Sequence, residues 1–222
     1  RSTRLATLFP YTTLFDLHPW EYNEVPVVLA AALAAGAHIT ALHLTRPAIP
    51  IPDRAALGIA SHFEAARGAY LIRDFQPGRK KMGTILVQGT LSTHNTVAIL
   101  PKLEEAGLNV KIVAIISPQL WTLQPAEYRE RILPEEDWID STCISNRSRR
   151  LLHDWLPHQV AAEYAMTSDF DNRWRTGGNL DEVIEEAHLS PEWLLKGIER
   201  FVRDRESRLG RLRAALDKAS RA

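Results

Sequence analysis

Short apolar runs alternate with helical segments through the second half of the chain, and this alternation restricts the possible folds more than any other feature. The runs read as strands, and the segments between them, 92–106, 124–133 and a stretch opened by Asn146, read as helices. The predicted strands are TILVQG at 84–89, NVKIVAII at 109–116, WIDSTCIS at 138–145 and VAAEYAM at 160–166. Strands separated by helices are joined by right-handed crossovers. The sequence therefore predicts an α/β fold with a mainly parallel sheet and helices on both faces.

A smaller set of elements precedes this domain. Asn23 is suited to cap a helix that ends at Gly36, and HITALHLT at 38–45 then reads as a strand. One helix and one strand cannot cover both faces of a sheet, so residues 16–78 are predicted to be an incomplete α/β piece. It ends in a linker over 74–83, which leads into a domain spanning 79–222.

The two ends of the chain differ from its middle. Residues 1–15 show no lasting helical or strand repeat, and we expect them to be a non-native leader outside the fold. At the other end, 179–189 and 190–216 are predicted helices, the second one opened by Ser190. Beyond Asp204 that helix becomes strongly charged, and we expect it to leave the core there.

Composition excludes several classes of protein. The 222 residues carry 27 basic and 27 acidic side chains, so no overall field attracts nucleic acid or an anionic membrane. The longest apolar stretch, 25–39, is too short to span a bilayer. Cys143 is the single cysteine and lies in an apolar run, which predicts a buried, unreactive thiol. A cytoplasmic protein is the expectation.

Arg46 is the strongest candidate for binding a ligand. In LHLTRPAIP, 42–50, residues Leu42 to Thr45 read as the end of a buried strand, which would place Arg46 at the carboxyl edge of a sheet. Open α/β sheets bind ligands at that edge, and a guanidinium offers a planar set of donors to phosphate or carboxylate. The alternative is a structural salt bridge to a neighbouring helix.

Other polar and aromatic residues give weaker signals. No two of the histidines at 18, 43, 62 and 94 have the spacing of a helical metal site, so core or surface positions are expected for them. If one of these histidines has a functional role, His62 is the first to consider. Trp174 lies in the polar stretch DNRWRTGG and suggests an interface contact.

Several stretches, taken in order, resemble the C-terminal third of a transketolase from about Asp16 to Val202. HPWEYNEVPVVLAAAL, 18–33, is similar to the family stretch that ends in Asn-Glu before a helix, and LTRPAIP resembles its Leu-Ser-Arg-Gln segment. Three further stretches resemble transketolase segments and follow in the same order as in that family: GAYLIRD, LVQGT and LQPAEYRERILP. Two departures indicate a divergent branch: SDFDNRWRTGG replaces a Phe-Gly-x-Ser motif, and Tyr22 replaces the aspartate before Asn-Glu.

The resemblance implies an enzyme of carbohydrate metabolism. It would transfer a two-carbon ketol unit between sugar phosphates with thiamine diphosphate and magnesium, as a homodimer, and Arg46 would bind the sugar phosphate. The family's Gly-Asp-Gly to Asn motif and its catalytic glutamate are not found in these residues. The resemblance therefore assigns no catalytic or metal-binding residue here, and the fragment alone is expected to be inactive.

Two other functions stay open. One is the E1 component of a 2-oxo acid dehydrogenase, which Arg46 disfavours because a small oxo acid carries no sugar phosphate. The other is a non-catalytic dimerisation or regulatory module.

Overall fold

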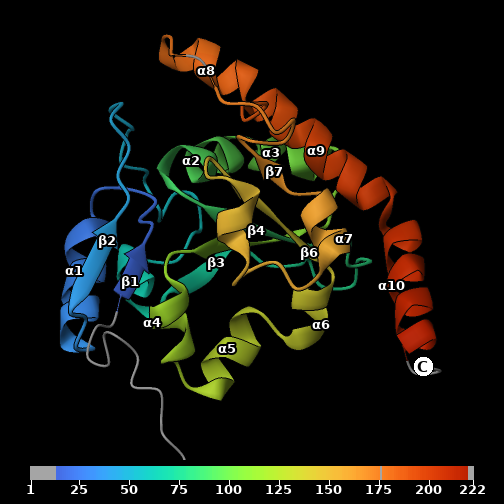
Figure 1. The fold of residues 1–222 in the computed structure, drawn as a ribbon, viewed down its shortest axis with the longest axis horizontal. Helices are drawn as coiled ribbons and strands as arrows, with labels where there is room; N and C mark the ends of the chain where they lie inside the picture. Colours follow the sequence, from blue (N-terminus) through green and yellow to red (C-terminus); the bar gives the residue numbers. More distant parts are fainter. Residues whose placement is uncertain (1–13, 176, 220–222) are drawn as a thin grey trace, which may run out of the picture.

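The computed structural model describes residues 14–175 and 177–219 and contains two sheets (Figure 1). The larger sheet has five strands in the order β3-β5-β4-β6-β7. Its strands are β3 Ala69–Arg73, β4 Thr84–Gln88, β5 Lys111–Ile115, β6 Ser141–Ser145 and β7 Met166–Thr167. All neighbouring pairs are parallel except β3 with β5, which is antiparallel. The predicted α/β class with a mainly parallel sheet is therefore confirmed.

The central strands are buried on both faces, as their unbroken apolar runs require. Side chains alternate along β4, so Ile85 and Val87 enter one cluster of core residues while Leu86 enters another. The first cluster is covered by α2 Thr90–Ala98, α3 Leu100–Glu105 and α9 Pro191–Arg203. The second is covered by α5 Ala126–Ile132, with aromatic side chains from α4 Pro118–Thr122 and α6 Glu135–Ile139. Helices on both faces are confirmed.

The N-terminal elements form a small parallel unit that shares the first core cluster. β1 Leu14–Leu17 pairs with β2 Ile39–Leu42, and α1 Glu24–Ala34 connects them. Phe15 is 2% exposed, so Leu14 and Phe15 belong to the fold, contrary to their expected exclusion with the leader. The other residues of the expected leader, 1–13, lie outside the described residues. Ile39 is 50% exposed because this sheet has only two strands, so the predicted buried strand is open to solvent.

The expected boundary near residues 78 and 79 cuts across the larger sheet. β3 precedes that boundary yet pairs with β5 in the sheet. The loop 74–83 contains no helix or strand, as predicted, but it is held in place. The side-chain nitrogen of Asn109 donates hydrogen bonds to the backbone carbonyls of Gln76, Arg79 and Lys80. Its side-chain oxygen accepts one from the backbone N–H of Gln76.

Two of the predicted elements are wrong in type or extent. Residues 160–163 lie in a helix, α7 Gln159–Glu163, and only Met166–Thr167 forms the strand. The helix forms because the His158 imidazole accepts a hydrogen bond from the Ala161 amide and so caps its first turn. The helix predicted to open at Asn146 is a short 3₁₀ helix, η2 Arg149–Leu152.

The C-terminal helices form an arc along one side of the molecule (Figure 1). They are α8 Leu180–Glu186, α9, and α10 Arg205–Ala219, with a break at Asp204. The predicted departure from the core at that break is wrong for the first turn of α10, because Arg208 is fully buried. Further along, Leu216 is 70% exposed, so the end of α10 does leave the core. No helix in the described residues is long and apolar enough to cross a membrane.

Candidate functional site

A cleft with a volume of about 640 Å³ lies where the parallel strands end. Its walls come from the segments that follow β2, β6 and β7, together with α8, and its lining includes Thr45, Pro47, Ser148, Arg150, Ser168, Asp169, Trp174, Arg175 and Val183. Residues carried on loops at the carboxyl ends of strands converge in this way in many open α/β proteins. The cleft is therefore the first candidate for a ligand site.

The charged groups of the cleft are partly neutralised. Arg175 forms an ion pair with Asp171 and donates hydrogen bonds to the carbonyls of Ser168 and Glu186. Burial raises the pKa of Asp169, but hydrogen bonds from Ser148, Thr167 and the Arg149 amide outweigh it and hold that pKa below its usual value. Arg150 has no ion pair within the described part of the chain and is exposed. The cleft therefore keeps a cation available to an anionic ligand.

Arg46 lies beside this cleft, between the lining residues Thr45 and Pro47. Its side chain is exposed, and among residues 14–175 and 177–219 it makes no ion pair, so the alternative salt bridge to a helix is not found there. β2 already ends at Leu42, which places Arg46 in a loop and not at the end of a strand. Its predicted role in binding a phosphate stays a prediction.

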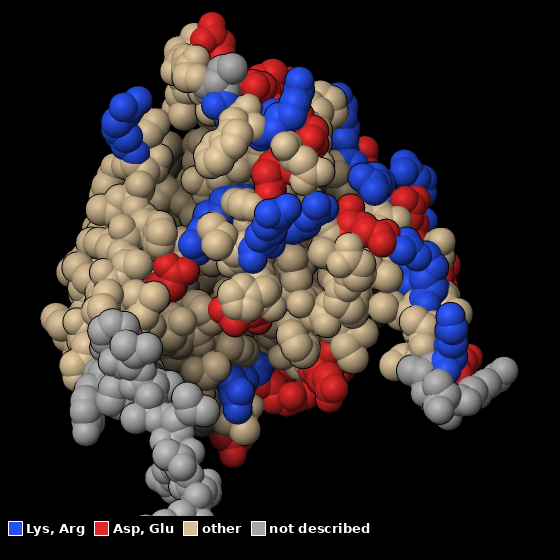
Figure 2. Space-filling view, in the orientation of Figure 1, with Lys and Arg blue, Asp and Glu red and all other residues tan. Residues whose placement is uncertain are grey.

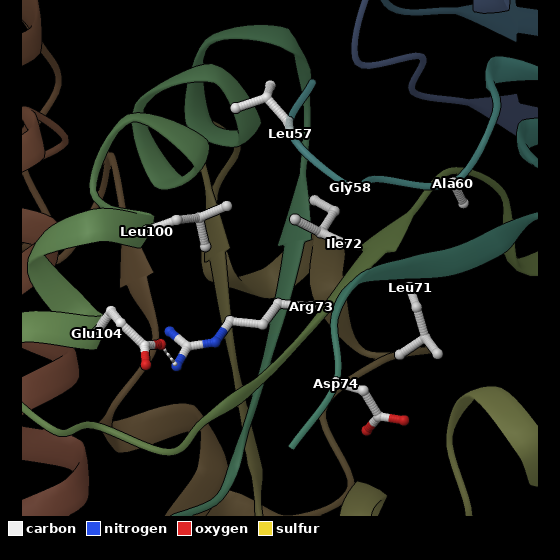
Figure 3. A pocket seen from close by; sticks show the side chains of 9 residues that line it. All are labelled: Leu57, Gly58, Ala60, Leu71, Ile72, Arg73, Asp74, Leu100 and Glu104. Atoms are coloured by element: carbon white, nitrogen blue, oxygen red, sulfur yellow. Dashed lines mark hydrogen bonds and ion pairs between the residues drawn. The ribbon is translucent and has the colours of Figure 1, made fainter. Parts of the chain in front are cut away.

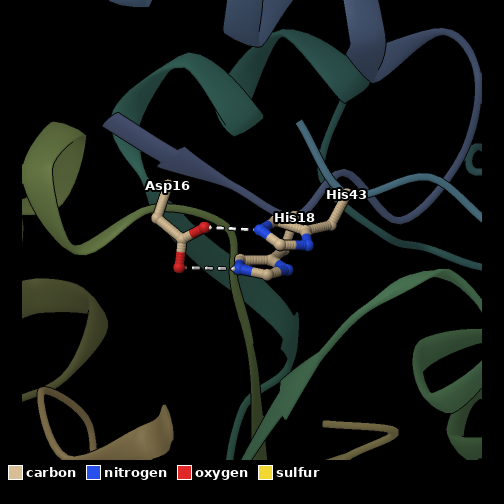
Figure 4. Close-up of side chains that lie close together, drawn as sticks. All are labelled: Asp16, His18 and His43. Carbon is tan, nitrogen blue, oxygen red and sulfur yellow. Dashed lines mark hydrogen bonds and ion pairs between the residues drawn. The ribbon is translucent and has the colours of Figure 1, made fainter. Parts of the chain in front are cut away.

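A cluster of Asp16, His18, His43 and Arg147 lies next to the cleft, and Figure 4 shows the first three of these side chains. The two oxygens of the Asp16 carboxylate face the Nε2 atoms of His18 and His43 at 3.1 and 2.7 Å. The two imidazole rings are stacked, with centroids 4.2 Å apart. Arg147 follows β6, and its Nη1 atom lies 2.8 Å from Asp16 and 2.6 Å from His18.

The pairing of β1 with β2 brings this cluster together. In their parallel register Leu17 lies opposite Leu42, and the His43 amide donates to the Leu17 carbonyl at 2.9 Å. The sequence, in which no two histidines have the spacing of a helical metal site, therefore did not predict that His18 and His43 lie together. A strand assigned at 14–17 would have revealed the pair, since each histidine directly follows its strand.

Burial and charge set the protonation of the cluster. Burial raises the pKa of Asp16, but the hydrogen bonds and charges of His18 and Arg147 outweigh it and hold that pKa well below its usual range. Burial, Arg147 and His43 together lower the pKa of His18. The Nε2 atom of His18 faces both Asp16 and Arg147, so it donates to the carboxylate when protonated or accepts from the guanidinium when unprotonated, but it does not do both at once.

The remaining residues singled out in the sequence lie apart from the cluster. Cys143 is fully buried in β6, and burial raises the pKa of its thiol, which confirms the predicted unreactive thiol. His62 lies against the tilted ring of Phe63 in a 3₁₀ helix, η1 His62–Arg67. Trp174 is 97% exposed, and its suggested interface contact stays a prediction.

A second cavity, with a volume of about 560 Å³, lies beside the end of β3 (Figure 3). Its walls include Leu57, Leu71 and Leu100, and the Arg73 side chain reaches across it to Glu104 at 3.1 Å. Arg73 also donates to the Leu108 carbonyl. Because this cation is already paired, the cavity is a weaker candidate than the cleft.

Known proteins resemble the chain in sequence and in fold. No protein-family model matches it. The transketolase of Geobacillus stearothermophilus is 28% identical over 134 residues, which cover 59% of this chain and 19% of that protein. The structure of Leishmania mexicana transketolase matches 86% of the chain with a TM-score of 0.67 and 16% identity. A Pichia stipitis transketolase mutant in complex with xylulose 5-phosphate matches 87% with a TM-score of 0.64 and 19% identity.

The chain is similar to part of a transketolase. This confirms the resemblance that the sequence indicated. The chain spans about 19% of the length of the transketolase sequences it matches and 26% of the two transketolase structures.

The stretch likened to the transketolase Asn-Glu motif leads into a buried network. Glu24 is fully buried and accepts hydrogen bonds from Arg54 at 2.5 Å, from the Tyr70 hydroxyl at 2.6 Å and from the Trp20 amide at 2.6 Å. Burial raises the pKa of Glu24, while Arg54 lowers it, and the net shift is upward. Every partner is enclosed, so the network ties α1 to β3 and is not open to a ligand. Asn23 precedes the helix without capping it by its side chain.

The transketolase cofactors do not fit the cleft. Magnesium is bound mainly by carboxylates together with phosphate oxygens. Asp169 is occupied by three hydrogen bonds, and Asp171 is paired with Arg173 at 2.9 Å and with Arg175. Asp169, which lines the cleft, and the nearby Asp171 are therefore not free to hold a magnesium diphosphate.

Proposed function

We propose that this chain is the C-terminal part of a transketolase that transfers a two-carbon ketol unit between sugar phosphates with thiamine diphosphate and magnesium. Similarity to transketolases in sequence and fold supports this. Transketolase structures from Pichia stipitis hold xylulose 5-phosphate or sedoheptulose 7-phosphate, which supports sugar phosphates as substrates. We further propose a cytoplasmic homodimer in which residues 16–78 are the end of one domain and 79–222 form the next, with β3 of the first part completing the sheet of the second.

The observation that carries the proposal is the position of Arg46. Arg46 is exposed, has no ion pair among the described residues and directly adjoins two residues that line the cleft, which also contains the free Arg150. Two unpaired cations on loops that follow parallel strands suit a dianionic phosphate. Arg46 would thus bind the phosphate and hold the sugar for the reaction.

The cofactors belong elsewhere in this proposal. The carboxylates of Asp169 and Asp171 are already hydrogen-bonded or paired with arginine. Thiamine diphosphate and magnesium would therefore bind mainly to segments outside these 222 residues. These residues would then orient substrate but carry out no chemistry, and the fragment alone would be inactive.

Ketol transfer by the full-length gene product tests the proposal. Removing the phosphate contact costs at least about 1.5 kcal/mol, so Arg46→Ala should raise the KM of a phosphorylated ketose by about tenfold or more. The KM of a non-phosphorylated donor should stay nearly unchanged. Lys102→Ala, an exposed cation on α3 outside the cleft, is the matched control. Equal losses on both donors would assign Arg46 a structural role, and a full-length product without transferase activity would refute the proposed function.

A non-catalytic dimerisation module is a second candidate, favoured by one surface. The side of the molecule over α1 and β2 carries few charged side chains (Figure 2). Leu33 is 69% exposed and Ile39 50% exposed on these elements, and Leu44 just beyond β2 is 53% exposed. Apolar surface of this kind is typical of an interface. A full-length dimer that binds no thiamine diphosphate would favour this reading.

A further inference from the structure

We propose that Asp16, His18 and His43 form a binding site for a divalent transition-metal ion such as Zn²⁺, and that Arg147 takes the place of the ion when it is absent. This inference does not depend on the proposed function. It follows from the positions of Asp16, His18 and His43 (Figure 4) and of Arg147, which lie at or just after the ends of β1, β2 and β6.

The ligand set suits this class of metal. Two imidazole nitrogens and one carboxylate oxygen are typical zinc ligands, and a set of three leaves a coordination position open. One ligand atom from each residue lies within 4.8 Å of the others. Around tetrahedral zinc, neighbouring ligand atoms are about 3.4 Å apart. Asp16 contacts the two histidines through different oxygens, at 3.1 and 2.7 Å, so these contacts are shorter than that spacing and the side chains must move slightly apart around an ion.

The backbone holds the three ligands in place. Asp16 and His18 are two positions apart at the end of β1 and so point to the same face. His43 follows β2 and is fixed to β1 by its amide hydrogen bond to Leu17. His18 is enclosed, with its side chain 2% exposed, whereas that of His43 is 43% exposed. The stacked rings must therefore splay to share one ion, and His43 has the free space to tilt.

Arg147 competes with the ion for the same atoms. Its Nη1 atom is within hydrogen-bond distance of both Asp16 Oδ2 and His18 Nε2. These are two of the atoms that would bind the metal, and two cations cannot share them. Metal binding must therefore displace the guanidinium. Asn146 and Ser148, on either side of Arg147, line the cleft, so occupancy of the metal site would change the cleft wall.

Calorimetric titration of the metal-stripped 222-residue chain with Zn²⁺ tests the inference, with the visible spectrum of bound Co²⁺ as a second readout of ligand geometry. We expect one ion per chain. His43→Ala and Asp16→Asn should each weaken binding by at least about tenfold. Arg147→Gln should strengthen binding by about tenfold, because it removes the competing cation. Circular dichroism confirms that each variant is folded.

The control is His62→Ala, which removes a histidine outside the cluster and should leave affinity unchanged. Failure of the wild-type chain to bind would overturn the inference. So would binding that survives both His43→Ala and Asp16→Asn, because the ion would then lie elsewhere. An Arg147→Gln variant that binds no more tightly than wild type would remove Arg147 from the site.

Discussion

The Arg208 guanidinium lies 3.6 Å from the centroid of the Phe201 ring, and both side chains are fully buried. Arg208 also donates a hydrogen bond to Asp140 at 3.0 Å, just before β6, and one to the Phe201 carbonyl. A cation on the last helix is thus enclosed against the main core, and it fixes the start of α10 to α9.

Arg208→Ala should destabilise the chain by about 3 kcal/mol, because it removes the more deeply buried of the two arginines that pair with Asp140 and the packing over Phe201. Urea unfolding followed by circular dichroism measures the change. Arg211→Ala is the control: its pair with Glu163 at 2.8 Å is half exposed, and its loss should change stability little. Equal effects of the two variants would show that α10 does not depend on the buried pair.

Gly68→Ala should destabilise the chain by more than about 3 kcal/mol. Gly68 has a φ of +83°, and a Cβ there would lie 2.5 Å from the Ser117 carbonyl oxygen and against the Trp121 amide nitrogen. Both are backbone atoms, so neither can move aside cheaply. Gly210→Ala in α10 meets no atom within 4 Å and should stabilise the chain by roughly 1 kcal/mol. Thermal unfolding of both variants checks the contrast, and a tolerated alanine at 68 would contradict it.

Asp169 should make stability depend on pH on the acid side. Its hydrogen bonds hold its folded pKa below the usual value of 3.8, so the unfolded chain binds the proton more tightly. The stabilising contribution is therefore complete above that value and is lost as the pH falls through the lower, folded pKa. Asp169→Asn should cost more stability at about pH 7 than at about pH 2. Urea titrations at both pH values measure this, and an equal cost at the two would show that the carboxylate charge is not involved.

Local signals account for the parts of the fold that the sequence predicted. β4, β5 and β6 lie in apolar runs buried on both faces. The helix predicted over 92–106 is divided into α2 and α3 beside Pro101, and Gly107, with a φ of +68°, follows its end. In contrast, the short apolar run at 160–166 fits a helix or a strand, and only the imidazole cap of His158 decides for the helix.

The sites depended on contacts that no local pattern records. His18 and His43 meet because β1 pairs with β2, and β1 overlaps the segment that was expected to lie outside the fold. Arg54 reaches Glu24 and Tyr70 from a loop without periodicity. The prediction for Arg46, which stays a prediction, was possible because its signal, a cation following an apolar run, is local.

The antiparallel strand β3 has a practical consequence for dissecting the protein. It forms one border of the larger sheet and shields the backbone of β5, although it comes before the loop at 74–83. Recombinant expression that starts within this loop would leave the β5 edge bare and inclined to self-associate. The C-terminal half should therefore be produced from a point upstream of Ala69.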